Sequence, residues 1–128
     1  MVEESMWGAA PQSGKGIKLP SEYLDEQATI LTKMYGYKLR GDVTQSVLST
    51  GRITIDFDII VPSLSSYRYS LLKVMHDLEI YPLTLYGLAN KTDYKCHNEE
   101  EFKDSLKEVL SSGQVRTVIE NILTLIKK

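Results

Sequence analysis

The sequence predicts a single α+β domain that has an N-terminal helix, an antiparallel sheet of about four strands in meander order, and two C-terminal helices packed on one face. Two patterns predict this fold. Apolar residues recur every three or four positions near both ends of the chain, and they alternate with polar residues over 53–61. With 128 residues, of which 42% are apolar and 25% charged, the chain is large and apolar enough to bury one core.

Residues 1–18 mix small, polar and charged residues without a period, so we expect a flexible arm over 1–18 and one folded domain over 19–128. Within this arm, Gly8–Gly16 resembles a phosphate-binding loop. The spacing of its glycines is too long, however, and a glycine replaces the Ser or Thr that such a loop carries after its lysine. We therefore interpret this stretch as part of the arm. We expect the aromatic side chain of Trp7 to dock on the domain.

From Ser21 onwards the pattern predicts an amphipathic helix. Acidic residues in its first turn suit the positive end of a helix dipole, and Gly36 supplies a left-handed stop at its end. The apolar stripe of this helix consists of Tyr23, Leu24, Ala28, Leu31 and Met34.

Two strands, over Tyr37–Leu48 and Ile53–Val61, are expected to follow as a hairpin. The second strand alternates fully, because its odd-numbered apolar residues share one face and its Thr and Asp residues share the other. Val47 and Ile55 fall on the same side only if the loop has an odd number of residues. A three-residue loop with Gly51 in the left-handed conformation is the most natural choice.

The stretch Tyr67–Glu79 fits either a strand or a helix, since its apolar residues have helical spacing but its aromatic and branched side chains favour a strand. The span Tyr67–Pro82, with the sequence Y-R-Y-S-L-L-K-V-M-H-D-L-E-I-Y-P, resembles a pattern of short uncharacterised bacterial proteins. That resemblance, which includes the C-terminal helices, implies a β-hairpin followed by a helical C-terminus and implies no activity. We therefore predict a strand. Ile80–Tyr86 is expected to form a short strand at a sheet edge or with a bulge, because Pro82 cannot donate to a ladder.

Gly87–His97 is predicted to be a polar loop. Asn98 and Glu101 then form a capping box, in which Asn98 accepts from the Glu101 backbone and Glu101 reaches back. The helix that this box opens is expected to end at Ser111–Gly113, where a last helix begins. The apolar faces of these helices consist of Phe102, Leu106, Val109 and Leu110 in the first, and of Val115, Val118, Ile119, Ile122, Leu125 and Ile126 in the second.

Charge and cysteine usage narrow the class of protein. Fifteen basic and seventeen acidic residues give a formal net charge of −2, which disfavours nucleic acid as a partner. A single cysteine, Cys96, excludes an internal disulfide, and no apolar run reaches the length of a membrane span. We therefore expect a cytoplasmic protein without a cofactor. We also expect no metal, because Cys96 and His97 provide too few zinc ligands. Its place just before a helix predicts a lowered pKa for the Cys96 thiol.

The best candidate for a binding surface combines aromatic and basic side chains, which dominate the hot spots of protein interfaces. Its residues are Tyr67, Arg68, Tyr69, Tyr81 and Tyr86, with Arg52 and Lys73 as further basic members. In a strand, Tyr67 and Tyr69 share one face while Arg68 points to the other. Packing of these tyrosines in the core or at its rim is the alternative interpretation.

A second candidate site combines Asp56, Asp58 and His76. The two carboxylates share the polar face of their strand, and the expected hairpin register sets them opposite Ser46 and Thr44. A solvated sheet face and a turn histidine that caps backbone groups are the alternative interpretations. No third acidic or histidine ligand lies nearby in the sequence, so this pair does not predict a metal site.

These patterns contain no catalytic signature, so we predict a small non-enzymatic interaction, regulatory or accessory domain, including the immunity type. It would bind another protein or a second copy of itself through an open sheet face or the strand at Pro82. The alternative is a small hydrolase or ligand-binding enzyme in which Asp56, Asp58 and His76 converge in a pocket. A third hypothesis, single-stranded RNA binding by the sheet tyrosines, requires a basic groove beside them.

Overall fold

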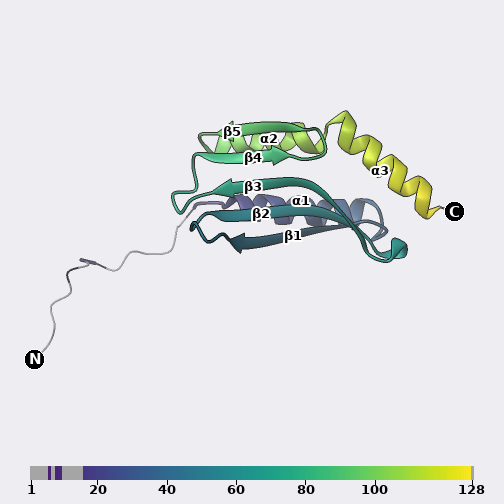
Figure 1. Cartoon of the computed structure of the whole chain (residues 1–128), viewed down its shortest axis with the longest axis horizontal. Helices are drawn as coiled ribbons and strands as arrows, with labels where there is room; N and C mark the ends of the chain where they lie inside the picture. The colour runs from purple at the N-terminus through teal and green to yellow at the C-terminus, as the bar shows by residue number, and fades with distance from the viewer. Residues whose placement is uncertain (1–5, 7, 10–15, 128) are drawn as a thin grey trace, which may run out of the picture.

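A computed structural model describes residues 6, 8–9 and 16–127 of the chain, and it confirms the predicted α+β class (Figure 1). The elements in chain order are α1 (Pro20–Met34), β1 (Arg40–Val47), β2 (Ile53–Val61), the 3₁₀ turn η1 (Pro62–Leu64), β3 (Tyr67–His76), β4 (Leu83–Gly87), β5 (Thr92–Cys96), α2 (Glu99–Leu110) and α3 (Gly113–Ile126). Trp7, and with it most of the predicted arm, lies outside the described residues.

The five strands form one antiparallel sheet in the order β1-β2-β3-β4-β5, which confirms the predicted meander. In Figure 1, α1 lies behind β1–β3 and α2 lies behind β4 and β5, while α3 runs beyond the ends of β4 and β5. Helices therefore cover one face of the sheet, and the opposite face carries no described helix. The largest fully buried side chains are Phe57, Phe102, Leu24, Leu39, Ile55 and Ile59, and they fill the space between the layers.

The covering helices differ from the expected pair, because α1 and α2 do most of the covering. α3 buries only Val115 and Ile122, although apolar residues recur along it, and Leu125 is 59% exposed. An amphipathic helix usually turns its whole apolar stripe toward the core. α3 therefore leaves part of its apolar stripe uncovered by the described chain.

The strand count is five because part of the predicted loop Gly87–His97 is strand β5. In β5 only Tyr94 and Cys96 pack inward, and the other three residues are polar and exposed. A short edge strand with so few apolar positions gives little alternation, which is why the sequence pattern suggested a loop.

The first hairpin has the predicted three-residue loop. Val47 pairs with Ile53, the Leu48 N–H donates to the Arg52 carbonyl oxygen at 2.8 Å, and Gly51 in the loop between them has the predicted left-handed conformation with φ of 89°. The predicted pairs of Asp56 with Ser46 and of Asp58 with Thr44 are wrong, because the loop is centred one residue earlier than they require, which shifts the register by two positions. The faces are unchanged, since a shift by two keeps every side chain on its side.

Tyr67–His76 is a strand, as predicted, and it contains an irregularity. The register between β2 and β3 shifts between Phe57 and Asp58, which leaves Leu71 as an extra residue in β3. This bulge lets the two consecutive residues Leu71 and Leu72 both be buried, at 2% and 0% exposure.

The strand after Pro82 lies inside the sheet and not at its edge, which corrects the prediction. β4 begins at Leu83 and pairs with β3 on one side and with β5 on the other. Pro82 precedes the first ladder residue, so its missing N–H group costs the ladder no hydrogen bond.

The predicted helix ends are confirmed with one difference. Gly36 has the left-handed φ of 58° just after α1, and the Asn98 side chain accepts from the Glu101 backbone at 2.9 Å. The Glu101 carboxylate, however, reaches back to His97, where it accepts from the backbone N–H at 2.8 Å, and not to Asn98. No helix among the described residues is long and apolar enough to cross a membrane.

Candidate functional site

The most distinctive feature of the sheet is a difference in length between two neighbouring strands. β3 pairs with β2 along all of Tyr67–His76, whereas β4 pairs only with Leu72–Met75. On the side that faces away from β2, Tyr67–Ser70 therefore has no strand partner among the described residues. We call this side the free β3 edge.

The chain turns away from β3 at the end of β4, and this turn sets where the free β3 edge begins. A Cβ atom on Gly87 would lie 2.0 Å from the Asn90 side chain and 2.9 Å from the Thr92 carbonyl oxygen, so a larger residue would require a shift of the backbone. The next two N–H groups, of Leu88 and Ala89, both donate to the Leu71 carbonyl oxygen, at 3.0 and 3.2 Å. Beyond Leu71, no described backbone group continues the ladder.

The open side of the sheet beside the free β3 edge carries a cluster of three charges. Arg68 Nη1 donates to Asp42 Oδ2 at 2.9 Å and to Asp58 Oδ2 at 2.7 Å. These contacts raise the pKa of Arg68, first through the hydrogen bond to Asp58 and then through that to Asp42. Asp42 and Asp58 are direct cross-strand partners, and like charges placed so repel each other. Arg68 therefore offsets a repulsion that the strand register creates.

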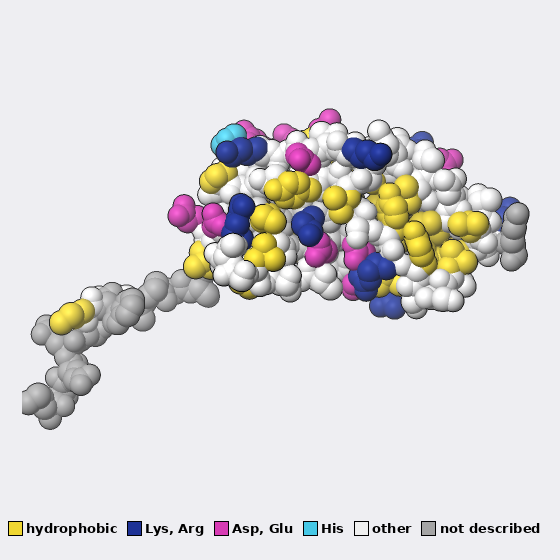
Figure 2. Space-filling view, viewed as in Figure 1, with side chains coloured by type: hydrophobic (Ala, Val, Ile, Leu, Met, Phe, Trp, Pro, Cys, Tyr) yellow, Lys and Arg dark blue, Asp and Glu magenta, His cyan; other side chains and the backbone are white. Residues whose placement is uncertain are grey.

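The helix side of the sheet beside the free β3 edge contains an apolar groove of about 290 Å³. Phe57 and Leu71 form its floor, α1 forms one wall, and α3 forms the other. The apolar wall residues are Ile30, Leu31 and Met34 on α1 and Val115, Ile119 and Leu123 on α3. Figure 2 shows hydrophobic side chains gathered between the sheet and α3, next to mixed basic and acidic side chains over the strands. The groove is the uncovered space left by the partly buried α3.

The five predicted partner-binding residues do not form one surface. Tyr67 and Tyr69 lie on the helix side of β3, opposite Val61 and Ile59, while Arg68 lies on the open side. These three residues belong to the free β3 edge, and Tyr67 is 53% exposed.

The other two residues of that prediction lie elsewhere. Tyr86 pairs with Lys73 and is on the open side, over β4. Tyr81 precedes β4, and its hydroxyl is buried without a hydrogen-bond partner among the described residues. Their positions in the sequence did not show that Tyr81 and Tyr86 lie apart from Tyr67 and Tyr69 in the fold.

The structure does not bring Asp56, Asp58 and His76 together. The two carboxylates are on the open side of β2, whereas His76 pairs with Ile53 and is on the helix side, only 6% exposed. His76 Nδ1 lies 2.8 Å from the Asp77 carbonyl oxygen, and Lys73 forms an ion pair with Asp56 at 3.7 Å. The shared pocket that the hydrolase hypothesis requires is therefore not present. The described residues also contain no cluster of three His, Cys, Asp or Glu side chains suited to a metal ion.

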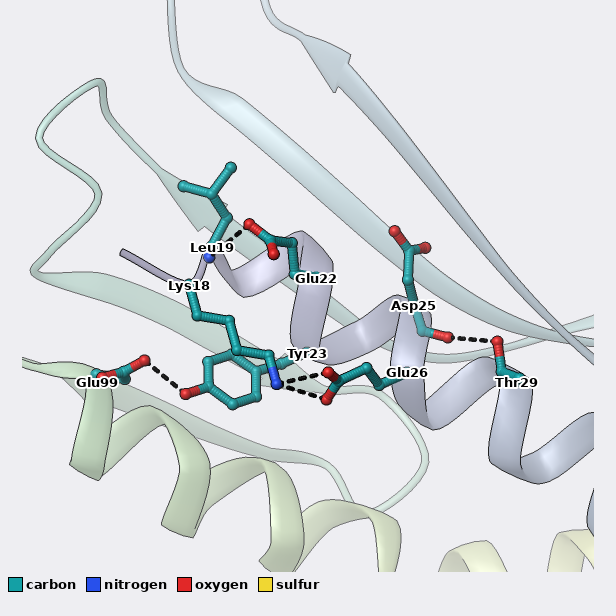
Figure 3. Close-up of polar contacts among 8 residues, drawn as sticks. All are labelled: Lys18, Leu19, Glu22, Tyr23, Asp25, Glu26, Thr29 and Glu99. Carbon is teal, nitrogen blue, oxygen red and sulfur yellow. Dashed lines mark hydrogen bonds and ion pairs between the residues drawn. The ribbon is translucent and has the colours of Figure 1, made fainter. Parts of the chain in front are cut away.

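A second polar cluster joins the starts of α1 and α2 (Figure 3). The Tyr23 hydroxyl donates to Glu99 Oε2, and Lys18 Nζ forms an ion pair with Glu26 at 2.6 Å. Lys18 Nζ also lies 4.3 Å from the centre of the Tyr23 ring. The hydrogen bond to Glu99, with a further contribution from burial, raises the pKa of Tyr23 to about 12, and burial raises the pKa of Tyr81 to about 12. This cluster holds two helices together and presents no reactive group.

The prediction of a lowered Cys96 pKa is wrong. Cys96 is fully buried, and burial raises the pKa of its thiol. The thiol donates to Ser105 Oγ at 3.5 Å, inside the layer between β5 and α2. Cys96 precedes the helix but points into the core, where a thiolate is poorly solvated.

Comparison with protein-family models, with curated proteins and with solved structures found no match to this chain. The resemblance of Tyr67–Pro82 to short bacterial proteins stays a prediction. The free β3 edge and the groove beside it are thus the features from which a function can be inferred. Sequence reasoning missed them, although a ten-residue strand followed by a five-residue one was a signal that could have indicated the free β3 edge.

Proposed function

We propose that this chain is a small protein-interaction domain that binds an extended segment of a partner protein as an added strand on the free β3 edge. The observation that supports this most is that the side of Tyr67–Ser70 that faces away from β2 has no strand partner among the described residues, in the middle of a sheet. An unpaired edge offers a row of N–H and C=O groups that an extended peptide can pair with.

The other two edges of the sheet are less suited to this role. At β1, the N–H group of Gly41 already donates to Thr32 Oγ1 of α1, at 3.0 Å. β5 has only five residues, and short edge strands are a common means of limiting strand addition. The free β3 edge belongs to a ten-residue strand, and no helix side chain of the described residues accepts from its backbone.

The apolar groove adds affinity to such a binding mode. Alternate side chains of an added strand would point to the helix side, toward Leu71 and the groove. Burying one large aliphatic side chain there stabilises a complex by about 1.5–3 kcal/mol before the cost of ordering the peptide. Leu125 of α3 is 59% exposed and Ile119 and Leu123 are only partly buried, which fits a surface that is covered only in a complex.

A displayed library of short random peptides, selected against the whole chain, tests this proposal. For a peptide that binds, each backbone N–H is then replaced in turn by N-methyl, which removes one donor. We expect binding to be lost at every second position, because only alternate N–H groups of an added strand face β3. The matched control is N-methylation of the intervening positions, which should leave affinity nearly unchanged.

Loss of binding without this two-residue period would contradict strand addition, and so would a library that yields no binder. Sedimentation of the free chain provides a separate check on the occupant. A stable dimer that is disrupted by Tyr67→Lys would show that a second copy, and not another protein, occupies the free β3 edge.

A further inference from the structure

The charge cluster beside the free β3 edge is incomplete. Asp58 has only 7% of its side chain exposed, and its Oδ1 atom has no hydrogen-bond donor among the described residues. Its other oxygen, Oδ2, and Asp42 Oδ2 both contact Arg68 Nη1, so one guanidinium group forms ion pairs with two carboxylates. Buried carboxylate oxygens are rarely left without a donor. The cluster therefore lacks one positive charge and one donor.

The geometry of Arg68 shows how far a basic side chain reaches on this sheet. Arg68 is on β3, and it contacts Asp42 on β1 with β2 lying between them. This spans two strand spacings, or about 10 Å between backbones. A strand added to the free β3 edge stands in the same relation to β2 as β3 does to β1. A basic side chain on the added strand thus reaches the position of Asp58.

The residue that such a side chain must cross is small. Ser70 pairs with Asp58, is on the open side of the sheet, and is exposed. The bulge at Leu71 sets this pairing, since it shifts the register just before Asp58. Arg68 approaches Asp58 Oδ2 from the neighbouring open-side position of β3, whereas Ser70, directly between the free β3 edge and Asp58, has only a short side chain.

We infer that the partner segment alternates apolar and basic residues, with a basic side chain that crosses Ser70 to Asp58 and apolar neighbours that point to the groove at Leu71. This inference rests on the proposed strand addition and specifies its partner. Consecutive residues of a strand point to opposite sides, so adjacent residues of the partner segment contact the charge cluster and the groove. A segment with acidic residues at the open-side positions would meet Asp42 and Asp58 and be rejected.

A set of synthetic peptides with alternating Val and Thr tests this chemistry on the whole chain. One central Thr position is replaced by Arg, Gln or Glu, and affinity is measured by fluorescence anisotropy. We expect the Arg peptide to bind about tenfold more tightly than the Gln peptide, because it adds a charge-assisted hydrogen bond. The Glu peptide should bind more weakly than the Gln peptide. High salt should narrow the difference between Arg and Gln.

Three variants of the chain identify the contact. Asp58→Asn should remove the preference for Arg over Gln and leave the affinity of the Gln peptide nearly unchanged. Ser70→Lys, at an exposed position that tolerates substitution, should also remove the preference because it places an ammonium group over Asp58 from β3 itself. Asp93→Asn removes an exposed carboxylate from the open side of β5 and serves as the control, so the preference should persist.

The outcomes separate the two proposals. If the Gln peptide binds but Arg gives no gain, the partner is not basic and strand addition still stands. If the gain for Arg survives both Asp58→Asn and Ser70→Lys, the basic side chain contacts another group and the inference is wrong. If no peptide of the set binds in any form, strand addition fails together with the inference.

Discussion

Two stretches of strand in this sheet, β1 and the first half of β3, have one side that pairs with no other strand among the described residues, and they differ in what lies beside that side. At β1, α1 packs so closely that a Cβ atom on Gly41 would lie 2.6 Å from the Ala28 Cα, and Thr32 accepts from the Gly41 N–H. At the free β3 edge, no described strand pairs with the backbone, and an apolar groove adjoins Leu71. The sheet thus places a helix against its outer edge at Gly41 and leaves an inner stretch without a second strand among the described residues.

The fold therefore protects the backbone of β1 in a way that it does not protect the free β3 edge. Natural proteins usually cover, shorten or charge their edge strands, because unpaired strands associate. α1 provides such a cover for β1 at Gly41. Along Tyr67–Ser70 the free β3 edge has no such helix contact among the described residues, and its one charged residue, Arg68, is engaged by Asp42 and Asp58, which supports a role in binding.

Gly41→Ala should have the largest effect, because it pushes α1 away from β1. The added methyl group meets backbone atoms of Ala28, which cannot move aside as a side chain can. We expect a loss of about 2–3 kcal/mol in the free energy of unfolding, measured by urea denaturation. Gly113→Ala is the control, since a Cβ there meets nothing within 4 Å. A change at Gly41 of less than about 0.5 kcal/mol would show that α1 does not cover β1 closely.

Alkaline pH should weaken the attachment of α1, the helix that covers β1. Tyr23 binds α1 to Glu99, and the pKa of both Tyr23 and Tyr81 is raised from 10.0 to about 12. A tyrosine that holds its proton more tightly when folded contributes stability that is complete below about pH 10 and lost as pH rises toward about 12. We expect the urea midpoint to fall across this window. Phenolate absorbance should show Tyr23 and Tyr81 titrating late, and Tyr23→Phe should remove one of these two late titrations.

Thr32→Val tests the single hydrogen bond between α1 and the β1 edge. The substitution keeps the shape of the side chain and removes the acceptor of the Gly41 N–H group. We expect a loss of about 1 kcal/mol in the free energy of unfolding and faster hydrogen exchange at the Gly41 amide. Thr29→Val, on the same helix, removes a hydroxyl that binds only the Asp25 carbonyl of its own helix and is the matched control. Equal exchange rates at Gly41 in both variants would contradict a role for Thr32.

Tyr67→Lys should have the smallest effect on folding, because the side chain is 53% exposed on the free β3 edge. We expect a change of less than about 0.5 kcal/mol in the free energy of unfolding. Peptide binding should nevertheless weaken, since a charge on the helix side of an edge opposes strand addition beside an apolar groove. A variant that folds normally and binds strand-forming peptides as well as the parent chain would place the binding surface elsewhere.

The sequence was sufficient to predict elements whose pattern is local. The alternation in Ile53–Val61, the cap at Asn98 and the left-handed Gly36 all follow from a few neighbouring residues, and the structure confirms each of them. Strand β5 was missed because only two of its five residues are apolar and inward.

The candidate site depends on relations between distant segments, which the sequence does not encode locally. The free β3 edge exists because the turn at Gly87 ends β4 early, and the groove exists because α3 is only partly buried. Tyr67, Arg68 and Tyr69 were predicted as binding residues from their chemistry alone. Their separation from Tyr81 and Tyr86 depends on the register of β3 with β4 and on where the intervening turn lies.

Hydrogen exchange at single amides tests the central claim most directly. In the free chain, the amides of Tyr67–Ser70 that face away from β2 should exchange fast while the Gly41 amide exchanges slowly. Addition of the Arg-containing strand peptide should slow those β3 amides and leave Gly41 unchanged. If the amides of Tyr67–Ser70 were all protected before any peptide is added, or if the peptide slowed exchange along β1 instead, β3 would have no free docking edge.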